Sequence, residues 1–321
     1  MYFRRFREYT GVTGRNEPDM IKMQIACLCV TLLLALYSRQ SRYLNTRTSR
    51  AFRWMIRVVM LNLIFDIATV SMITYRDRIP IGLIRVMHVL FLWTVEAGLW
   101  LMLQYVMLVV DNERMNPKVA CRLADIPLFA GMAVTALAPL KIVWSPAGTY
   151  YSGIPVYTSY VLVIYDLLLS AAMLIYFSKD VEHEKRQTVY PALTVTAVLP
   201  FIEFVMPTVF VSGLCMTIAL LSIFLSRENP DEFYNRETGM FNENGFLKMI
   251  DENIHTREEF HLVLFTISNV VQIREKAGVD GMNLCLKQIS AKIHQMYHHN
   301  CYALDDNELV FFAGSKSAAQ A

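Results

Sequence analysis

The hydrophobic pattern divides the chain into a long apolar part and a shorter polar part. Seven apolar segments precede residue 226, and each approaches the roughly 20 residues that a membrane-crossing helix needs. They are Met20–Tyr37, Trp54–Thr74, Leu83–Val110, Ile126–Trp144, Val156–Phe177, Thr188–Val205 and Thr208–Ser226. We therefore predict an α-helical membrane bundle of seven transmembrane helices, in which a tight turn at Pro207 joins the last two.

After Ser226 charged residues return and the apolar runs become short. Residues 229–254 acquire helical spacing in their second half, and residues 258–268 contain a short apolar run typical of a buried strand. Residues 270–297 predict a helix, a glycine-containing turn and a second helix. The stretch YALDDNELVFF, residues 302–312, has two apolar runs around an acidic turn, which is typical of a β-hairpin. This order predicts the start of an α+β or α/β domain.

The composition agrees with a chain that lies partly in lipid. Hydrophobic residues make up 55% and charged residues 18%, whereas a soluble domain carries about 25% charged residues. The net charge of +2 is too small to indicate a nucleic-acid partner. The six cysteines form no CxxC pair, so we expect neither a disulfide framework nor a zinc site. The first apolar run lacks a small-residue cleavage site, so we expect it to remain as a membrane helix.

The basic residues of the loops predict the orientation. The first, third and fifth loops contain lysine and arginine, whereas the fourth and sixth contain neither. Because basic loops stay in the cytoplasm, we expect a multi-pass plasma-membrane protein with its N-terminus outside and its C-terminal domain in the cytoplasm. The basic N-terminal tail disagrees with this orientation. The expected parts are a tail (1–19), the membrane domain (20–226), the soluble domain (227–312) and a disordered tail (313–321).

The soluble domain contains three motifs that resemble the GGDEF, or diguanylate cyclase, family. RETGMFNENGF, residues 236–246, is similar to the family's opening D-x-L-T-G-L-x-N-R-x-x-F, with matches at Thr238, Gly239, Phe241, Asn242 and Phe246. Residues 262–286 stand where the family has D-I-D-x-F-K, then N-D and G-H-x-x-G-D. DDNEL stands where the G-G-D-E-F signature belongs. The resemblance implies a partial α/β domain of the nucleotide-cyclase-like, ferredoxin type.

The resemblance also implies a site that has lost its chemistry. The family makes cyclic di-GMP from two GTP molecules, one bound by each half of a dimer, with metal ions held by acidic side chains. Thr266 aligns with the metal-binding Asp, Arg274 with a guanine-binding Asn, and Asn283 with a guanine-binding Asp. The signature positions are occupied by Asp305, Asp306, Asn307 and Glu308. Only Glu308 is retained, so we expect no catalytic residue, metal or cofactor, although a homodimer through this domain remains implied.

Several other interpretations are open at this stage. The family's domain continues beyond the hairpin, so we expect either a fragment or a naturally shortened domain; in related membrane proteins an EAL phosphodiesterase domain often follows. An active diguanylate cyclase and a transporter-like binding protein are the alternatives. A histidine kinase would need a glycine-rich nucleotide lid, which the sequence lacks. We favour a bacterial membrane sensor coupled to an inactive GGDEF-like domain in cyclic di-GMP signalling.

Charged residues inside predicted spans suggest what the membrane part detects. Such residues are costly in lipid and by default indicate function. Asp66, Glu96 and Asp166 lie near the middle of their spans, and Trp93 and Trp100 share the helix face of Glu96. Acids beside aromatic rings could hold a small cationic ligand through charge and cation–π contacts.

Two further residues, Glu203 and His88, lie nearer the outer ends of their spans and could line the entrance to this site. The alternative is that the buried acids are protonated and hydrogen-bond neighbouring helices. The sequence leaves both interpretations open.

Overall fold

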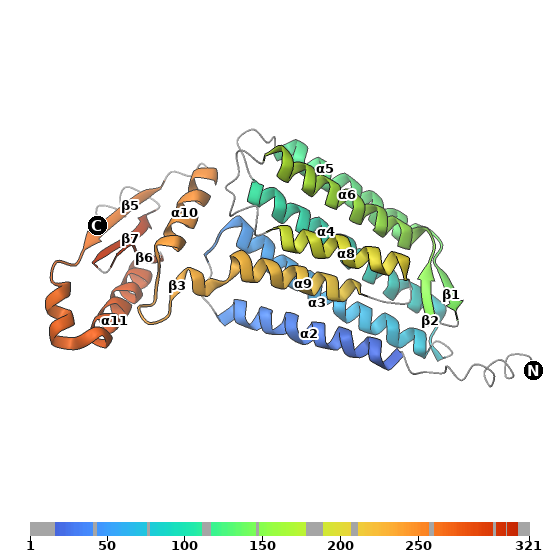
Figure 1. The fold of residues 1–321 in the computed structure, drawn as a ribbon, viewed down its shortest axis with the longest axis horizontal. Helices are drawn as coiled ribbons and strands as arrows, with labels where there is room; N and C mark the ends of the chain where they lie inside the picture. Colours follow the sequence, from blue (N-terminus) through green and yellow to red (C-terminus); the bar gives the residue numbers. More distant parts are fainter. Residues whose placement is uncertain are drawn as a thin grey trace, which may run out of the picture. The chain divides into compact units, whose positions relative to one another are not determined.

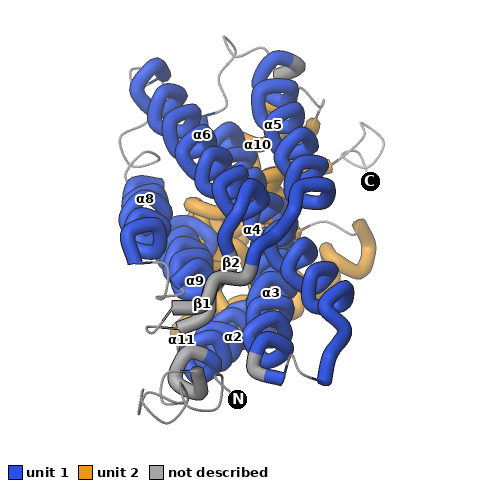
Figure 2. The backbone as a smooth tube through the Cα atoms, turned by 90° about the vertical axis from the view of Figure 1, so that its right-hand side faces the viewer, with its two compact units in different colours: residues 1–39, 50–228 blue, residues 40–49, 229–321 orange. Residues whose placement is uncertain are grey.

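The computed structural model consists of two compact units (Figure 2). One unit contains residues 1–39 and 50–228, and the other contains residues 40–49 and 229–321. The described residues are 17–40, 44–75, 78–110, 117–145, 148–177, 189–206, 211–256, 260–297, 300–305 and 307–313.

The first unit is a bundle of helices that run alongside one another (Figure 1). Its described helices are α2 (Glu17–Gln40), α3 (Arg47–Thr74), α4 (Ile81–Val110), α5 (Pro117–Leu137), α6 (Ile154–Tyr176), α8 (Tyr190–Val205) and α9 (Ser212–Ile223). A π-helical turn, η2 (Phe224–Glu228), extends α9. Five helices, α2 to α6, are long and apolar enough to cross a membrane, whereas α8 is a shorter apolar helix. The chain therefore has the helical architecture of a membrane protein.

Each predicted apolar segment contains a helix, but the fourth prediction was wrong at both ends. α5 begins at Pro117 and ends at Leu137. A proline suits the first turn of a helix, and Pro139 disfavours helical geometry in the residue before it. The following residues Lys141–Ser145 form β1, which pairs antiparallel with β2 (Gly148–Ser152). The apolar residues of β1 had been assigned to the helix, because a short apolar run fits either element.

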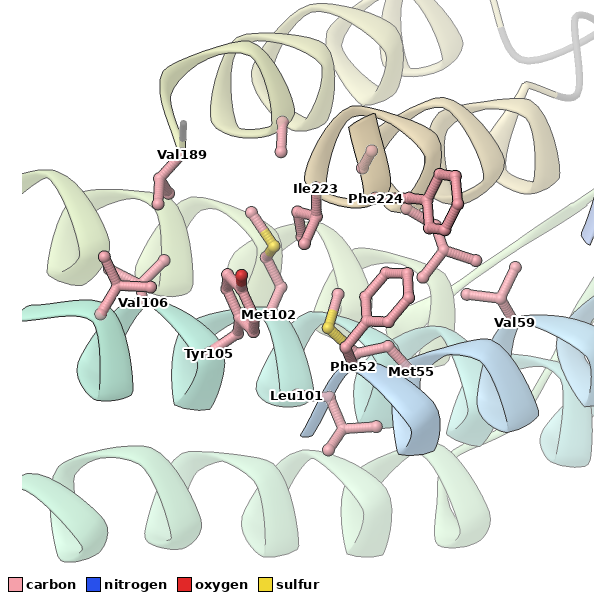
Figure 3. Close-up of a cluster of buried hydrophobic side chains, with 14 of the residues drawn as sticks. Phe52, Met55, Val59, Leu101, Met102, Tyr105, Val106, Val189, Ile223 and Phe224 are labelled. Carbon is pink, nitrogen blue, oxygen red and sulfur yellow. The ribbon is translucent and has the colours of Figure 1, made fainter. Parts of the chain in front are cut away.

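The core of the bundle lies between α3, α4 and α9 (Figure 3). Phe52 of α3 stacks on Phe224, with ring centroids 6.2 Å apart. The Tyr105 hydroxyl of α4 donates a hydrogen bond to Glu228 at 3.2 Å, which ties α4 to the end of η2. Other apolar side chains point outward: Leu33 is 66% exposed and Phe129 is 67% exposed. Such outward apolar surface suits contact with lipid.

The second unit is a five-stranded mixed sheet with two long helices. The strand order is β3-β4-β6-β7-β5, in which β4 and β6 are parallel and the other neighbours are antiparallel. The strands are β3 (Tyr234–Asn235), β4 (Met240–Phe241), β5 (His261–Thr266), β6 (Cys301–Ala303) and β7 (Glu308–Ala313). The helices are α10 (Glu243–Thr256) and α11 (Val270–Tyr297) (Figure 1).

The two helices cover opposite faces of this sheet. Side chains alternate along a strand, so neighbouring residues of β7 face different helices. Val310 lies in a buried cluster with Phe246 of α10, whereas Leu309 lies in another with Leu286 of α11. Arg47, the first residue of α3, belongs to this second unit, and its guanidinium pairs with Glu252 of α10 at 3.1 Å.

Two sequence predictions for this unit are confirmed, and one is wrong in part. β6 and β7 form the predicted hairpin, and Gly278, at φ +70°, interrupts the helical geometry of α11 as the predicted turn requires. β5 is a strand but is not buried on both faces: Leu262 is 44% and Leu264 59% exposed. The reason is that β5 lies at the edge of the sheet, while the buried cluster beneath α10 is centred on β6 and β7.

Candidate functional site

The end of β5 and the start of β7 bring together two positions that the resemblance singled out, the metal-binding position and one position of the signature. Thr266, the last residue of β5, is the register partner of Glu308, the first residue of β7. The backbone N–H of Ile267 also donates to the carbonyl of Asn307 at 2.9 Å. The side chains of Thr266 and Glu308 are both exposed. One hydroxyl and one carboxylate therefore lie side by side where β5 ends and β7 begins.

A pocket in the same unit collects further positions that the resemblance singled out. Its volume is about 260 Å³, measured for the centre of a water-sized sphere. Arg274, Asn283 and Asp305 all line it. Asp306 lies outside the described residues. Residues from α11 and from the hairpin loop, far apart in sequence, thus share one pocket.

The opening motif forms the other side of this pocket and is held in place by hydrogen bonds. The Asn242 side chain accepts from the N–H of Gly245 at 3.0 Å and donates to the carbonyl of Glu232 at 2.8 Å. The Asn283 amide donates to the Glu237 carboxylate at 3.0 Å. The Ser290 hydroxyl donates to the Gly239 carbonyl at 2.8 Å. The pocket is therefore a built polar surface, bounded on one side by a turn that is fixed to α11.

The chemistry available at this pocket is limited. Among the described residues, no group of three His, Cys, Asp or Glu side chains is placed to hold a metal ion. In the hairpin beside it, burial raises the pKa of the Cys301 thiol to about 12 and raises that of the Tyr302 phenol as well. Both groups stay protonated at neutral pH, so neither supplies a nucleophile or a base.

In the helical unit, Glu96 links three helices. Its carboxylate accepts hydrogen bonds from Thr135 of α5 at 2.7 Å and from Ser159 of α6 at 3.1 Å. Both bonds use Oε1; Oε2 is buried and has no hydrogen-bond partner in the described part of the chain. Glu96 is 1% exposed, so these contacts are fully shielded.

Asp66 makes a different set of contacts. Gln24 of α2 donates to its carboxylate at 2.9 Å. On the α9 side a Cβ at Gly213 would lie 3.5 Å from the same oxygen and 2.7 Å from Leu63, so glycine permits the close approach of α9. Asp166 is only partly buried. The described contacts do not join the three acids into one cluster.

The two tryptophans point their indole nitrogens at α5. Trp93 donates to the carbonyl of Met132 at 3.0 Å, and Trp100 donates to the Asp125 carboxylate at 2.9 Å. His88 is buried, with its ring 5.7 Å from that of Phe91. The aromatic cation site around these residues thus remains a prediction.

The structure also contains a cavity that the sequence did not reveal. It lies among α3, α4, α6, α8 and α9, and its volume is about 90 Å³ by the same measure as the pocket above. Glu203 and Ser159 are among its lining residues, whereas Asp66, Glu96 and Asp166 are not. The acid at residue 203, inside an apolar run, was the one signal in the sequence that pointed here.

No protein-family model and no curated protein matches this chain. Five long apolar helices fit the class of helical membrane proteins. Any finer assignment rests on the chain's own residues and their geometry.

Proposed function

We propose that this chain is a plasma-membrane signalling protein. Its helical unit detects a ligand or a state of the membrane, and its second unit is a cytoplasmic GGDEF-like domain that has lost cyclase activity. The domain acts in cyclic di-GMP signalling by contacting a partner or a second copy of the chain, and not by making the nucleotide.

The observation that carries this proposal is the convergence of positions chosen from sequence alone. Arg274, Asn283 and Asp305 were assigned to a nucleotide site by resemblance, and all three line one pocket. Thr266, assigned to the metal-binding position, pairs across the sheet with Glu308 of the signature. The convergence supports a nucleotide-binding ancestry.

The same geometry argues against catalysis. A triphosphate needs metal ions held by carboxylates, and the hydroxyl of Thr266 cannot replace a negative charge. Arg274 offers only hydrogen-bond donors at a position where the family reads guanine with an amide. Asn283 is neutral and bonded to Glu237. Asp305 adds negative charge where phosphates would lie.

The experiment is a cyclase assay on the full chain, purified in detergent, with GTP and magnesium or manganese. We expect no cyclic di-GMP above a no-protein control. Product that disappears in Glu308→Ala would overturn the inactive assignment and favour the active cyclase. A known active cyclase in the same detergent provides the positive control.

A further inference from the structure

The cavity among α3, α4, α6, α8 and α9 has the features of a small-molecule site. Its wall is mostly apolar, with side chains such as Phe91, Leu99 and Val163. Ligand sites are typically concave and apolar, with a few polar groups that fix orientation. Here the polar lining groups come from Ser159, Tyr160, Thr196, Glu203 and Ser212.

The charge of these groups selects the ligand. Among the described residues that line the cavity, Glu203 has the only carboxyl group, and none is a lysine, arginine or histidine. An anionic ligand would therefore have no opposite charge to meet, whereas a cationic head would meet a carboxyl group. Hydroxyl groups around it supply further acceptors.

Among the buried polar atoms that lack a hydrogen-bond partner within the described residues, two lie at this cavity or behind its wall. Ser212 is a lining residue, and its hydroxyl has none. Glu96 Oε2 also has none, and Glu96 lies behind the wall, joined to it by the bond from Ser159. Buried polar groups are normally hydrogen-bonded, so each exception calls for an explanation.

The size of the cavity limits the ligand. Its volume of about 90 Å³ leaves room only for a small molecule. Tyr160 and Glu203 are only partly buried, which places this side of the cavity near the surface between α6 and α8. There the ring of Tyr160 meets that of Phe204 edge to face at 5.4 Å.

We infer that this cavity binds a small lipophilic amine, with its apolar body among the side chains of α3 and α4 and its ammonium group at Glu203. This inference rests on the proposed sensing role and names the ligand class for it. Hexylamine, a slender apolar chain with one ammonium group, has the required chemistry.

The test measures thermal unfolding of the full chain in a neutral detergent with hexylamine, hexanol or hexanoate. A ligand that binds only the folded state raises the unfolding temperature. We expect hexylamine to raise it in the wild type and hexanoate to leave it unchanged. In Glu203→Gln the amine should lose its advantage over hexanol.

A matched pair of variants locates the effect. Val163 lines the cavity, whereas Val161 of the same helix is 64% exposed on its outer surface. Val163→Phe should abolish the amine shift, and Val161→Phe should keep it. If Val163→Phe fails to fold, the comparison of hexylamine with hexanol in Glu203→Gln still tests whether the amine binds at this cavity.

No shift in the wild type, or an equal shift for all three compounds, would overturn the inference. So would a shift that survives in Val163→Phe. The thermal-shift test measures binding and does not depend on the cyclase assay. The amine site can therefore be wrong while the inactive-cyclase assignment holds, and the reverse is also possible.

Discussion

Thr266 and Glu308 lie opposite each other as register partners, at the last residue of β5 and the first residue of β7. The hairpin that carries Glu308 is joined to the end of β5 by the hydrogen bond from Ile267 to Asn307. This pairing places a hydroxyl where the GGDEF resemblance expects a carboxylate that binds metal. The first prediction follows from it.

Thr266→Asp alone should not restore cyclic di-GMP synthesis. The substitution places one carboxylate beside Glu308, but Arg274 and Asn283 still occupy the positions that the resemblance assigns to guanine binding. A coupled assay with GTP and manganese should give product no higher than the wild type. Synthesis by this single variant would show that the guanine positions do not limit activity.

The basic loops predict the membrane orientation. A reporter fused after Ser226 should register as cytoplasmic, and one inserted near Gly148 should register as external. The physical reason is that lysine and arginine hold the odd-numbered loops inside. Alkaline phosphatase and a fluorescent protein give opposite signals on the two sides, so each fusion is its own control. A reversed signal at either site would contradict the orientation.

Local patterns in the sequence predicted elements, but they did not predict packing. The hairpin at residues 301–313 was predictable because its two apolar runs and acidic turn lie within one short stretch. The end of α5 was not, because the apolar residues of β1 continue its hydrophobic pattern and only Pro139 marks the break. The sequence predicts that Leu262 and Leu264 belong to a buried strand, because no local feature marks β5 as an edge strand.

The candidate sites divide in the same way. The resemblance singled out Arg274, Asn283 and Asp305, and all three line one pocket. That this pocket is a nucleotide site stays a prediction. The cavity at Glu203 could not be predicted, because it is formed where five helices pack against one another. The directions of Trp93 and Trp100 likewise depend on where α5 lies.

Cys301 should resist alkylation in the folded protein. Burial raises the pKa of its thiol from 9.0 to about 12, so the reactive thiolate is scarce at pH 8. Peptide mapping after iodoacetamide treatment should find Cys301 unmodified and the half-buried Cys285 modified. Denaturant should make the two react alike. Rapid native labelling of Cys301 would contradict its buried position.

The same shift makes the second unit sensitive to alkali. Because the folded-state pKa is higher than the unfolded one, the contribution to stability is complete below pH 9.0 and is lost as pH rises toward about 12. The denaturant midpoint for Cys301 exposure should therefore fall over this window. A midpoint that rises with pH would contradict the sign.

Leu309→Ala should destabilise the second unit far more than Leu262→Ala. Leu309 is fully buried at 0% exposure, and truncating such a leucine costs about 2–5 kcal/mol. Leu262 is 44% exposed, so we expect a loss of about 1 kcal/mol or less. The denaturant concentration at which Cys301 becomes half-labelled measures the stability of the second unit in both variants. Equal losses would contradict the assigned faces of the sheet.

The central claim is that the pocket lined by Arg274 and Asn283 descends from a guanine site, and GTP binding by a restored variant tests it most directly. We predict that Arg274→Asn/Asn283→Asp binds GTP roughly tenfold or more tighter than the wild type, since a hydrogen bond to a charged group contributes about 1.5–3 kcal/mol. Affinity for ATP should not change. Lys276→Asn/Asn244→Asp, with the same change in charge at exposed positions, is the matched control. No gain for GTP over ATP, or an equal gain in the control, would contradict the account.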